Sequence, residues 1–142
     1  MNDEFAIQQT LNRYSQSASR GDWDQAVDTY APDGVWEIPH LGMKLEGRAA
    51  IRGALIQFIG VMEYVLQTNT PALIEVSGDT ASAQAAIREC GKFRGRDEGF
   101  EFFGFYVDSL VRTTGGWKFS KRIFELRGQH CFPALPMKQQ WS

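Results

Sequence analysis

The feature that most constrains the fold of this chain is the length of the strand-like stretches after residue 79. Residues 80–94 and 100–113 lack the helical spacing of apolar side chains, and glycine-containing turn sequences bound both stretches. Strands of this length twist, and neighbouring twisted strands stay paired over such a distance only if the sheet curls. The sequence therefore predicts a strongly bent antiparallel sheet.

Three helices are expected before these long strands. Apolar residues recur at helical spacing in residues 3–20, 22–30 and 48–62. Shorter strands are expected at residues 35–38, 43–46, 64–68, 73–76 and 117–126, the later ones continuing as an antiparallel meander. Helices followed by an antiparallel sheet are typical of the α+β class. We predict one α+β domain, in which the three helices close a half-barrel around an apolar pocket.

The charge and composition of the 142 residues narrow the range of partners. A net charge of −2 favours neither nucleic acid nor an anionic membrane surface. No apolar run approaches the roughly 20 residues that span a bilayer, and the first residues do not resemble a signal peptide. Cys90 and Cys131 form no CxxC motif and have no neighbouring set of histidine ligands. We expect a cytoplasmic protein without metal or cofactor, and with neither nucleic acid nor membrane as a partner.

Two charged residues fall on apolar faces of predicted strands. Side chains alternate across a strand, which places Glu89 with Ile87 and Phe93, and Arg122 with Phe124. A carboxylate in such surroundings must be paired, hydrogen-bonded or protonated, and its raised pKa suits proton transfer near neutral pH. Three interpretations stay open: a structural ion pair between Glu89 and Arg122, a β-bulge that turns Glu89 to solvent, or a functional site.

The stretch 100–113 is apolar on both faces. Alternation gives one face with Phe100, Phe102, Tyr106 and Leu110, and a second face with Phe103, Phe105, Val107 and Val111. One face can line the interior, but the other needs a cover. We therefore expect a homo-oligomer, a dimer or trimer, that forms through the outer face of the sheet.

Several short motifs occur together in a characteristic order. They are Gly21-Asp22-Trp23, Tyr30 to Trp36 (YAPDGVW), Leu45 to Arg48 (LEGR), Ile74 to Thr80 (IEVSGDT) and Gly115 to Arg122 (GGWKFSKR). Together they resemble the SnoaL-like branch of the nuclear-transport-factor-2-like superfamily, with the pattern nearest to members of the hexachlorocyclohexane dehydrochlorinase and scytalone dehydratase type. The resemblance implies a cone-shaped α+β barrel over residues 1–127, followed by a tail, 128–142, that covers the pocket or a subunit interface.

The resemblance also implies positions for catalytic residues. In dehydratases and dehydrochlorinases of this family an Asp after the first helix orients a His on the strand after the third helix, and an Arg on the last strand assists the departing anion. Asp22 and Arg122 match the Asp and Arg positions, whereas Val65 stands where the His is expected. With the Asp–His pair incomplete, Glu89 is the substitute acid-base, and Tyr14 joins Asp22 as an orienting residue.

The expected ligand is a small hydrophobic organic molecule. We expect its contacts from apolar and aromatic side chains of the helices and strands, namely Trp23, Trp36, Phe58, Met62, Val65, Ile87, Phe102, Tyr106 and Phe124. One hypothesis is a cofactor-free lyase or isomerase, dehydratase-like or cyclase-like, that acts by proton abstraction. The alternatives are a non-catalytic ligand carrier, which the absent His favours, and a small structural subunit of a ring-hydroxylating dioxygenase. The sequence does not decide whether the protein is an enzyme.

Overall fold

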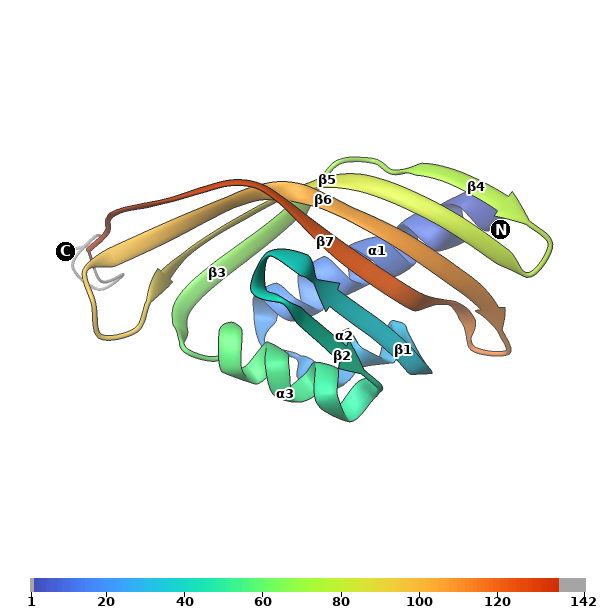
Figure 1. The fold of residues 1–142 in the computed structure, drawn as a ribbon, viewed down its shortest axis with the longest axis horizontal. Helices are drawn as coiled ribbons and strands as arrows, with labels where there is room; N and C mark the ends of the chain where they lie inside the picture. Colours follow the sequence, from blue (N-terminus) through green and yellow to red (C-terminus); the bar gives the residue numbers. More distant parts are fainter. Residues whose placement is uncertain (1, 136–142) are drawn as a thin grey trace.

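A strongly curved sheet arches over three helices in the computed structural model of the protein, which describes residues 2–135 (Figure 1). The helices lie on the concave side of the sheet. The sheet is not closed, because its edge strands β2 (Met43–Glu46) and β3 (Met62–Asn69) do not pair with each other. The predicted α+β class is confirmed, with helices completing the cone that the curved sheet leaves open.

The helix starts follow the capping residues in the sequence. The helices are α1 (Asp3–Arg20), α2 (Trp23–Asp28) and α3 (Arg48–Phe58). The Asn2 side chain accepts a hydrogen bond from the Phe5 amide at 2.7 Å, and Gly21, at φ 74°, ends α1 in the left-handed conformation. α3 ends before the predicted limit of residue 62. The chain turns sharply at Gly60, where a Cβ atom would lie 2.4 Å from the Ile56 carbonyl oxygen.

The strands form one sheet in the order β2-β1-β7-β6-β5-β3, with β4 also paired to β5. The remaining elements are β1 (Tyr30–Ile38), the 3-10 helix η1 (Pro39–Leu41), β4 (Leu73–Ser77), β5 (Thr80–Phe93), β6 (Glu98–Thr113) and β7 (Gly116–Pro133). Among the strands of residues 2–135, only β1 and β7 pair in parallel. The predicted meander is wrong at its start: β3 and β4 pair with successive parts of β5 instead of with each other.

Irregularities in strand pairing accompany the curvature. The β6–β7 register shifts between Phe103 and Gly104 and again between Ser109 and Leu110. Such bulges increase local twist and bend the strand that carries them. At Gly104 the neighbouring strand comes so close that a Cβ atom would lie 2.4 Å from the Glu125 carbonyl oxygen. The bend wraps the long strands around α1, against which the core packs.

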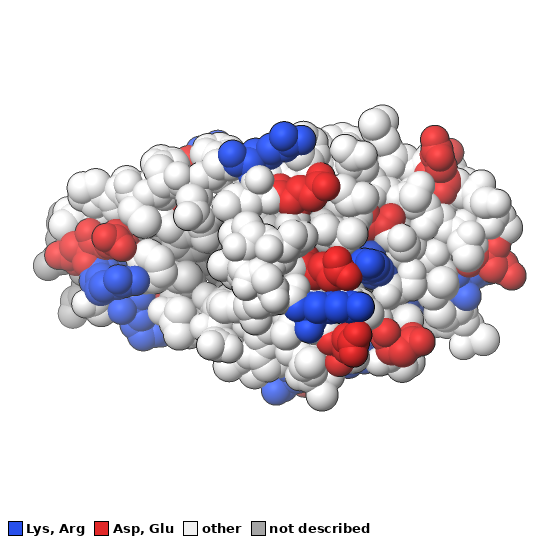
Figure 2. Space-filling model, in the orientation of Figure 1, with Lys and Arg blue, Asp and Glu red and all other residues white. Residues whose placement is uncertain are grey.

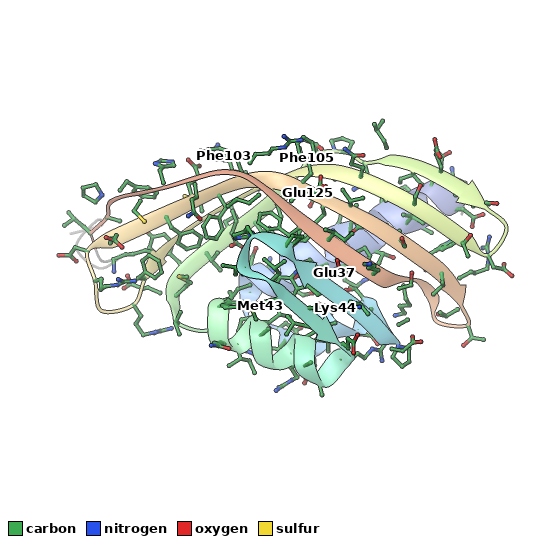
Figure 3. All side chains as sticks on the ribbon, viewed as in Figure 1. Glu37, Met43, Lys44, Phe103, Phe105 and Glu125 are labelled. Carbon is green, nitrogen blue, oxygen red and sulfur yellow. The ribbon has the colours of Figure 1, made fainter. Side chains whose placement is uncertain are left out.

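The outer face of the sheet remains apolar in places. Figure 3 shows Phe103 and Phe105 on β6 pointing away from the helices. Phe103 is 40% exposed, so the single chain leaves part of this face uncovered. Strand β7 continues to Pro133, so residues 128–133 of the predicted tail belong to the sheet, and residues 136–142 lie outside the described residues.

Charges of both signs are mixed on the face seen in Figure 2. Typical exposed pairs are Arg52 with Asp24, at 2.9 Å, and Lys44 with Glu46, at 3.5 Å. The described residues on this face therefore produce no extended region of one charge. Within residues 2–135, no helix is both long and apolar enough to cross a membrane.

Candidate functional site

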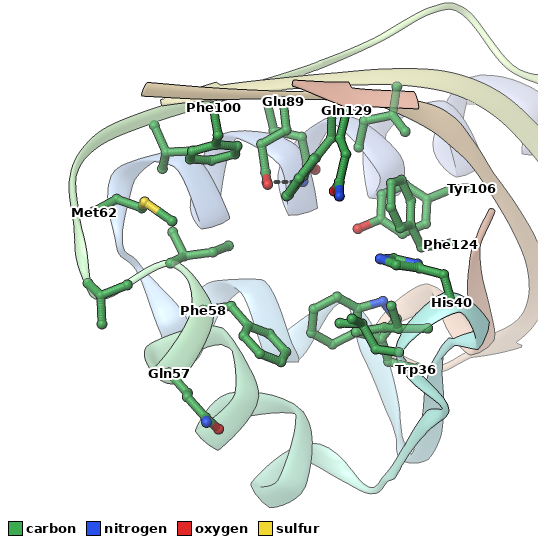
Figure 4. A pocket seen from close by; sticks show the side chains of 18 of the residues that line it. Trp36, His40, Gln57, Phe58, Met62, Glu89, Phe100, Tyr106, Phe124 and Gln129 are labelled. Atoms are coloured by element: carbon green, nitrogen blue, oxygen red, sulfur yellow. Dashed lines mark hydrogen bonds between the residues drawn. The ribbon is translucent and has the colours of Figure 1, made fainter. Parts of the chain in front are cut away.

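A cavity of about 380 Å³ lies between the concave face of the sheet and the ends of α1, α3 and η1 (Figure 4). Its wall is mostly aromatic and aliphatic. Tyr14 borders it from α1. Most of the ligand contacts expected from the sequence border it as well, namely Trp36, Phe58, Met62, Val65, Ile87, Phe102, Tyr106 and Phe124.

Glu89 reaches this cavity from the middle of β5. Its inward direction agrees with the alternation of the strand, since Ile87 and Phe93 border the same cavity. The opposite residue on β6 is Phe102, which in turn lies opposite Gln129 on β7. A carboxyl group thus sits among apolar side chains, and the proposed bulge that would have turned it to solvent does not occur in β5.

The Glu89 carboxyl is held by a chain of hydrogen bonds that begins on α1. Gln67 on β3 donates from Nε2 to Glu89 Oε1 at 3.0 Å. The Ser15 hydroxyl lies 3.1 Å from Gln67 Oε1, and the Gln67 backbone amide donates to the Ser19 hydroxyl oxygen at 2.8 Å. Gln67 is only 6% exposed, so both of its ends are fixed. Sequence reasoning missed Gln67 because its place opposite Glu89 depends on the β3–β5 register.

Burial raises the pKa of the Glu89 carboxyl, while the hydrogen bond from Gln67 acts in the opposite direction. Desolvation is the larger effect, and no Lys or Arg is found among the described residues that line the cavity. A raised pKa favours the protonated form of a carboxyl group, and enzymes adjust acid-base residues by burial in the same direction. Glu89 shares this property with such residues.

Arg122 does not pair with Glu89, and it does not border the cavity. Its Nε and Nη2 donate to the two carboxylate oxygens of Asp108, at 2.8 and 3.1 Å. The reason is register, since Asp108 on β6 lies directly opposite Arg122 on β7, whereas Glu89 lies opposite Phe102. The predicted pair of Arg122 with Glu89, whether structural or functional, is therefore wrong. Arg122 instead forms a buried ion pair with Asp108. Asp108 could have been found from the sequence, because it shares the inward parity of Tyr106.

Aromatic rings surround the Arg122 guanidinium. Its central carbon lies 3.7 Å from the ring centre of Tyr106, 4.1 Å from Phe119 and 4.6 Å from Tyr14. Burial raises the pKa of Tyr14, and of Tyr106 well above its usual range, although Arg122 opposes both shifts. Both phenols stay protonated at neutral pH and can donate hydrogen bonds at the cavity wall. Two of these rings, Tyr14 and Tyr106, border the cavity, whereas Arg122 does not.

Asp22 and Trp23, the other two predicted site residues, do not border the cavity. Asp22 is exposed and caps α2, accepting a hydrogen bond from the Gln25 amide at 3.2 Å. Trp23 packs at the edge of the core, beside Gly21. Both residues lie at the turn between α1 and α2, while the cavity opens beyond the end of α3. The orienting role expected for Asp22 is therefore not possible in this geometry.

His40 and Gln129 border the cavity without having been predicted from the sequence. His40 belongs to η1, and its ring centre lies 5.9 Å from that of Phe124. A single turn of 3-10 helix has no periodic pattern from which its direction could be read. Val65, at the position where the family resemblance implies a His, also borders the cavity. Within residues 2–135 no cluster of three or more potential metal ligands occurs.

Similar proteins share this architecture. An uncharacterized protein of Mycobacterium tuberculosis is 29% identical over 125 residues, which cover 87% of this chain and 84% of that protein. A proposed aromatic ring hydroxylase from Novosphingobium aromaticivorans superposes with a TM-score of 0.84 at 23% identity, over 92% of this chain and 93% of the other. A hexachlorocyclohexane dehydrochlorinase superposes with a TM-score of 0.81 at 17% identity, over 92% and 88%.

The two structural similarities show a common fold. The sequence itself matches the model of the SnoaL-like domain over residues 1–123, which includes the helices, strands β1–β6 and the first part of β7 up to Ile123. The motif order noted in the sequence is thus accounted for, and the chain belongs to the SnoaL-like domain family.

Proposed function

We propose that the protein binds a small uncharged cyclic organic molecule and acts on it as a cofactor-independent lyase or isomerase, with Glu89 transferring the proton. The observation that carries this proposal is the single fixed carboxyl group, with its raised pKa, in the wall of an otherwise apolar cavity. Structural carboxylates of this chain, such as Asp108, are neutralised by a cation. Glu89 has only the neutral Gln67 amide.

The wall of the cavity favours an uncharged ligand. Its described lining residues include no Lys and no Arg, so an anionic ligand would lose its hydration without gaining a permanent counter-charge. The aromatic side chains of Trp36, Phe58 and Phe102 offer flat apolar surfaces suited to a ring. A cavity of about 380 Å³ has room for a molecule of one or two rings.

The chemistry follows from the carboxyl group. Ionised Glu89 takes a proton from a carbon atom next to a carbonyl group, and the C–H electron pair moves into an enolate whose oxygen carries the negative charge. The enolate then re-forms the carbonyl group and expels a leaving group, with its bonding electron pair, from the next carbon, as in a lyase, or it takes the proton back at another carbon, as in an isomerase. The protonated phenols of Tyr14 and Tyr106 are placed to donate hydrogen bonds to the charge that develops. A structural neighbour that is a dehydrochlorinase supports an elimination.

A ligand carrier is the second candidate, and a specific observation favours it. Val65 makes the cavity wall apolar at the position where the family resemblance implies an imidazole. A cavity that has lost this group can still bind a ligand without converting it. In that case Glu89 would serve as a hydrogen-bonding partner of the ligand.

The test separates binding from proton transfer. Binding is measured by the fluorescence of 2-naphthol, with 2-naphthoate, which has the same ring system but carries a negative charge, as a comparison that should bind more weakly. Proton transfer is measured as the exchange of the α-hydrogens of 2-tetralone, an uncharged bicyclic ketone, in deuterium oxide. We expect Glu89→Gln to keep 2-naphthol binding within about threefold and to lower the enzyme-dependent exchange by about 100-fold or more.

The matched control is Glu125→Gln, which removes an exposed carboxylate on the outer face of the sheet (Figure 3). This variant should exchange 2-tetralone at the rate of the parent protein. If the parent protein binds 2-naphthol but exchanges no faster than Glu89→Gln, the lyase or isomerase proposal fails and the carrier remains. If 2-naphthol does not bind, both candidates fail.

A further inference from the structure

We infer that His40 is a second proton-transfer residue of the cavity, which acts as the acid toward a leaving hydroxyl group while Glu89 acts as the base. This inference rests on the proposed function. On this inference, the imidazole that the family resemblance implies on β3 is replaced by the His40 imidazole of η1. Three observations support the proposal. His40 borders the cavity, its ring nitrogens are free, and the other polar groups in the wall are poor proton donors.

The η1 turn holds His40 at the cavity. Pro39 occupies the first position of the turn, and the Gly42 amide donates to the Pro39 carbonyl oxygen at 2.9 Å. Gly42 adopts φ 63°, a left-handed conformation that closes the turn. The imidazole packs edge-to-face on Phe124, with 5.9 Å between ring centres and 67° between planes. The side chain thus has a defined direction although it lies at the open end of the cavity.

Glu89 and His40 approach the cavity from different sides. Figure 4 shows Glu89 hanging from the sheet and His40 rising from the connection between β1 and β2, with the cavity between them. A ligand that fills the cavity would therefore have one group near the carboxyl and another near the imidazole. This separation suits an anti elimination, in which the proton and the leaving group depart from neighbouring atoms on opposite sides of the ligand.

The His40 ring is free to bind a ligand. Within residues 2–135, no protein group hydrogen-bonds to either of its nitrogens, whereas Nε2 of the other histidine, His130, lies 2.8 Å from Glu101 Oε1. His130 also lies on the outer face, stacked on Phe103. The two histidines of the chain therefore differ in availability, and only His40 borders the cavity.

The remaining polar groups of the wall are poor sources of a proton at neutral pH. Burial raises the pKa values of Tyr14 and Tyr106, so their phenols are weaker acids than usual. Gln57, Gln67 and Gln129 carry amides that do not titrate. A histidine ring, by contrast, can carry a proton on either nitrogen and donate it to an oxygen of a ligand. His40 is thus the group of this cavity best suited to protonate a leaving oxygen.

The step balances in atoms and charge. The Glu89 carboxylate takes the hydrogen from the carbon next to a carbonyl group, the C–H electron pair becomes the new double bond, and the C–O bond to the neighbouring hydroxyl breaks. The departing oxygen takes a proton from the His40 imidazolium and leaves as water. Glu89 ends protonated and His40 neutral, and proton exchange with solvent restores both residues.

The experiment uses two probes that differ in the leaving group. The exchange of 2-tetralone needs a base alone, whereas the dehydration of 3-hydroxy-5-phenylcyclohexanone, followed by the ultraviolet absorbance of the enone, also needs an acid. We expect His40→Ala to keep the exchange within about threefold and to lower the dehydration by about 100-fold. Added imidazole should restore dehydration to His40→Ala and not to Glu89→Gln. The matched control is His130→Gln, which should change neither rate by more than about twofold.

Each outcome decides one proposal. If the parent protein exchanges 2-tetralone but dehydrates the hydroxyketone no faster than His40→Ala, the role of His40 is wrong while the role of Glu89 stands. The same conclusion follows if imidazole does not restore dehydration to His40→Ala. If the parent protein does not exchange 2-tetralone, the proposed function itself fails. Thermal unfolding of each variant verifies that the fold is intact.

Discussion

Arg122 and Asp108 form a two-point ion pair in the interior, with Nε and Nη2 of the arginine 2.8 and 3.1 Å from the two carboxylate oxygens. The Arg122 side chain is 2% exposed and the Asp108 side chain is fully buried. Burial raises the pKa of Asp108, and Arg122 opposes the shift. The pair lies behind Tyr14 and Tyr106, so it supports the cavity wall without contacting the ligand.

Removal of one partner of this pair should destabilise the protein strongly. Asp108→Leu leaves the guanidinium buried without a counter-charge, and we expect a loss of about 3–5 kcal/mol in the free energy of unfolding. The double variant Asp108→Leu/Arg122→Met should recover a large part of that loss, because no unpaired charge remains. Urea denaturation measures all three proteins. Arg52→Met, which breaks an exposed pair, should cost less than about 1 kcal/mol. Equal losses in the single and double variants would show that the charges are not the cause.

The stability of the protein should depend on the charge of Glu89. Since burial raises the pKa of this carboxyl above its ordinary value of 4.5, the folded state favours the protonated form. The contribution of Glu89 to the free energy of unfolding is therefore fully present at a pH below that ordinary value. It is lost as the pH rises through the pKa of the folded state. Glu89→Gln removes this loss, so its advantage in unfolding temperature over the parent protein should be larger at about pH 8 than at about pH 4. Glu125→Gln serves as the control, and a pH-independent difference for Glu89→Gln would contradict the raised pKa.

The close strand approach at Gly104 should tolerate no side chain. A Cβ atom there would lie 2.4 Å from the Glu125 carbonyl oxygen and 2.9 Å from the Phe124 ring. We expect Gly104→Ala to lower the free energy of unfolding by about 1–3 kcal/mol, because either the strand or the Phe124 ring must move. Gly128→Ala on β7 places its methyl group in open space and should have a much smaller effect in the same denaturation experiment. If both variants lost equal stability, the steric account of the bend would be wrong.

We propose that a second copy of the chain covers the apolar outer face of the sheet around Phe103, which is 40% exposed. A glutamate at this position would bring a charge into such an interface, so Phe103→Glu should shift the mass in multi-angle light scattering toward the monomer. Phe5→Glu on α1 introduces the same charge at an exposed phenylalanine outside the face and should leave the mass unchanged. A monomeric parent protein at all concentrations would contradict the proposal.

The sequence predicted the direction in which many of the site's side chains point, because alternation depends only on position along one strand. The inward position of Glu89 follows from its distance in sequence to Ile87 and Phe93, and the same rule assigns Tyr106 and Phe102 to the cavity side. The same rule also placed Arg122 on the inner face, where it is now seen. Alternation states which way a side chain points, and it states nothing about the residue on the next strand.

The partners of those side chains depended on contacts between distant segments. Arg122 meets Asp108 because β6 and β7 pair in a particular register, and Gln67 meets Glu89 because β3 pairs with β5 instead of β4. Bulges shift the β6–β7 register twice, and no local pattern predicts their positions. The error in pairing Arg122 with Glu89 arose at this step.

The sequence by itself determined the class of the fold, the order of helices before long strands and the faces on which the charged residues lie, because periodicity and turn residues act within a few positions along the chain. The tertiary structure alone decided which cation neutralises which carboxylate and that a histidine from η1 reaches the cavity. Such contacts join residues far apart in the sequence, so they depend on how the sheet curves over α1, and the packing of the whole chain sets that curvature.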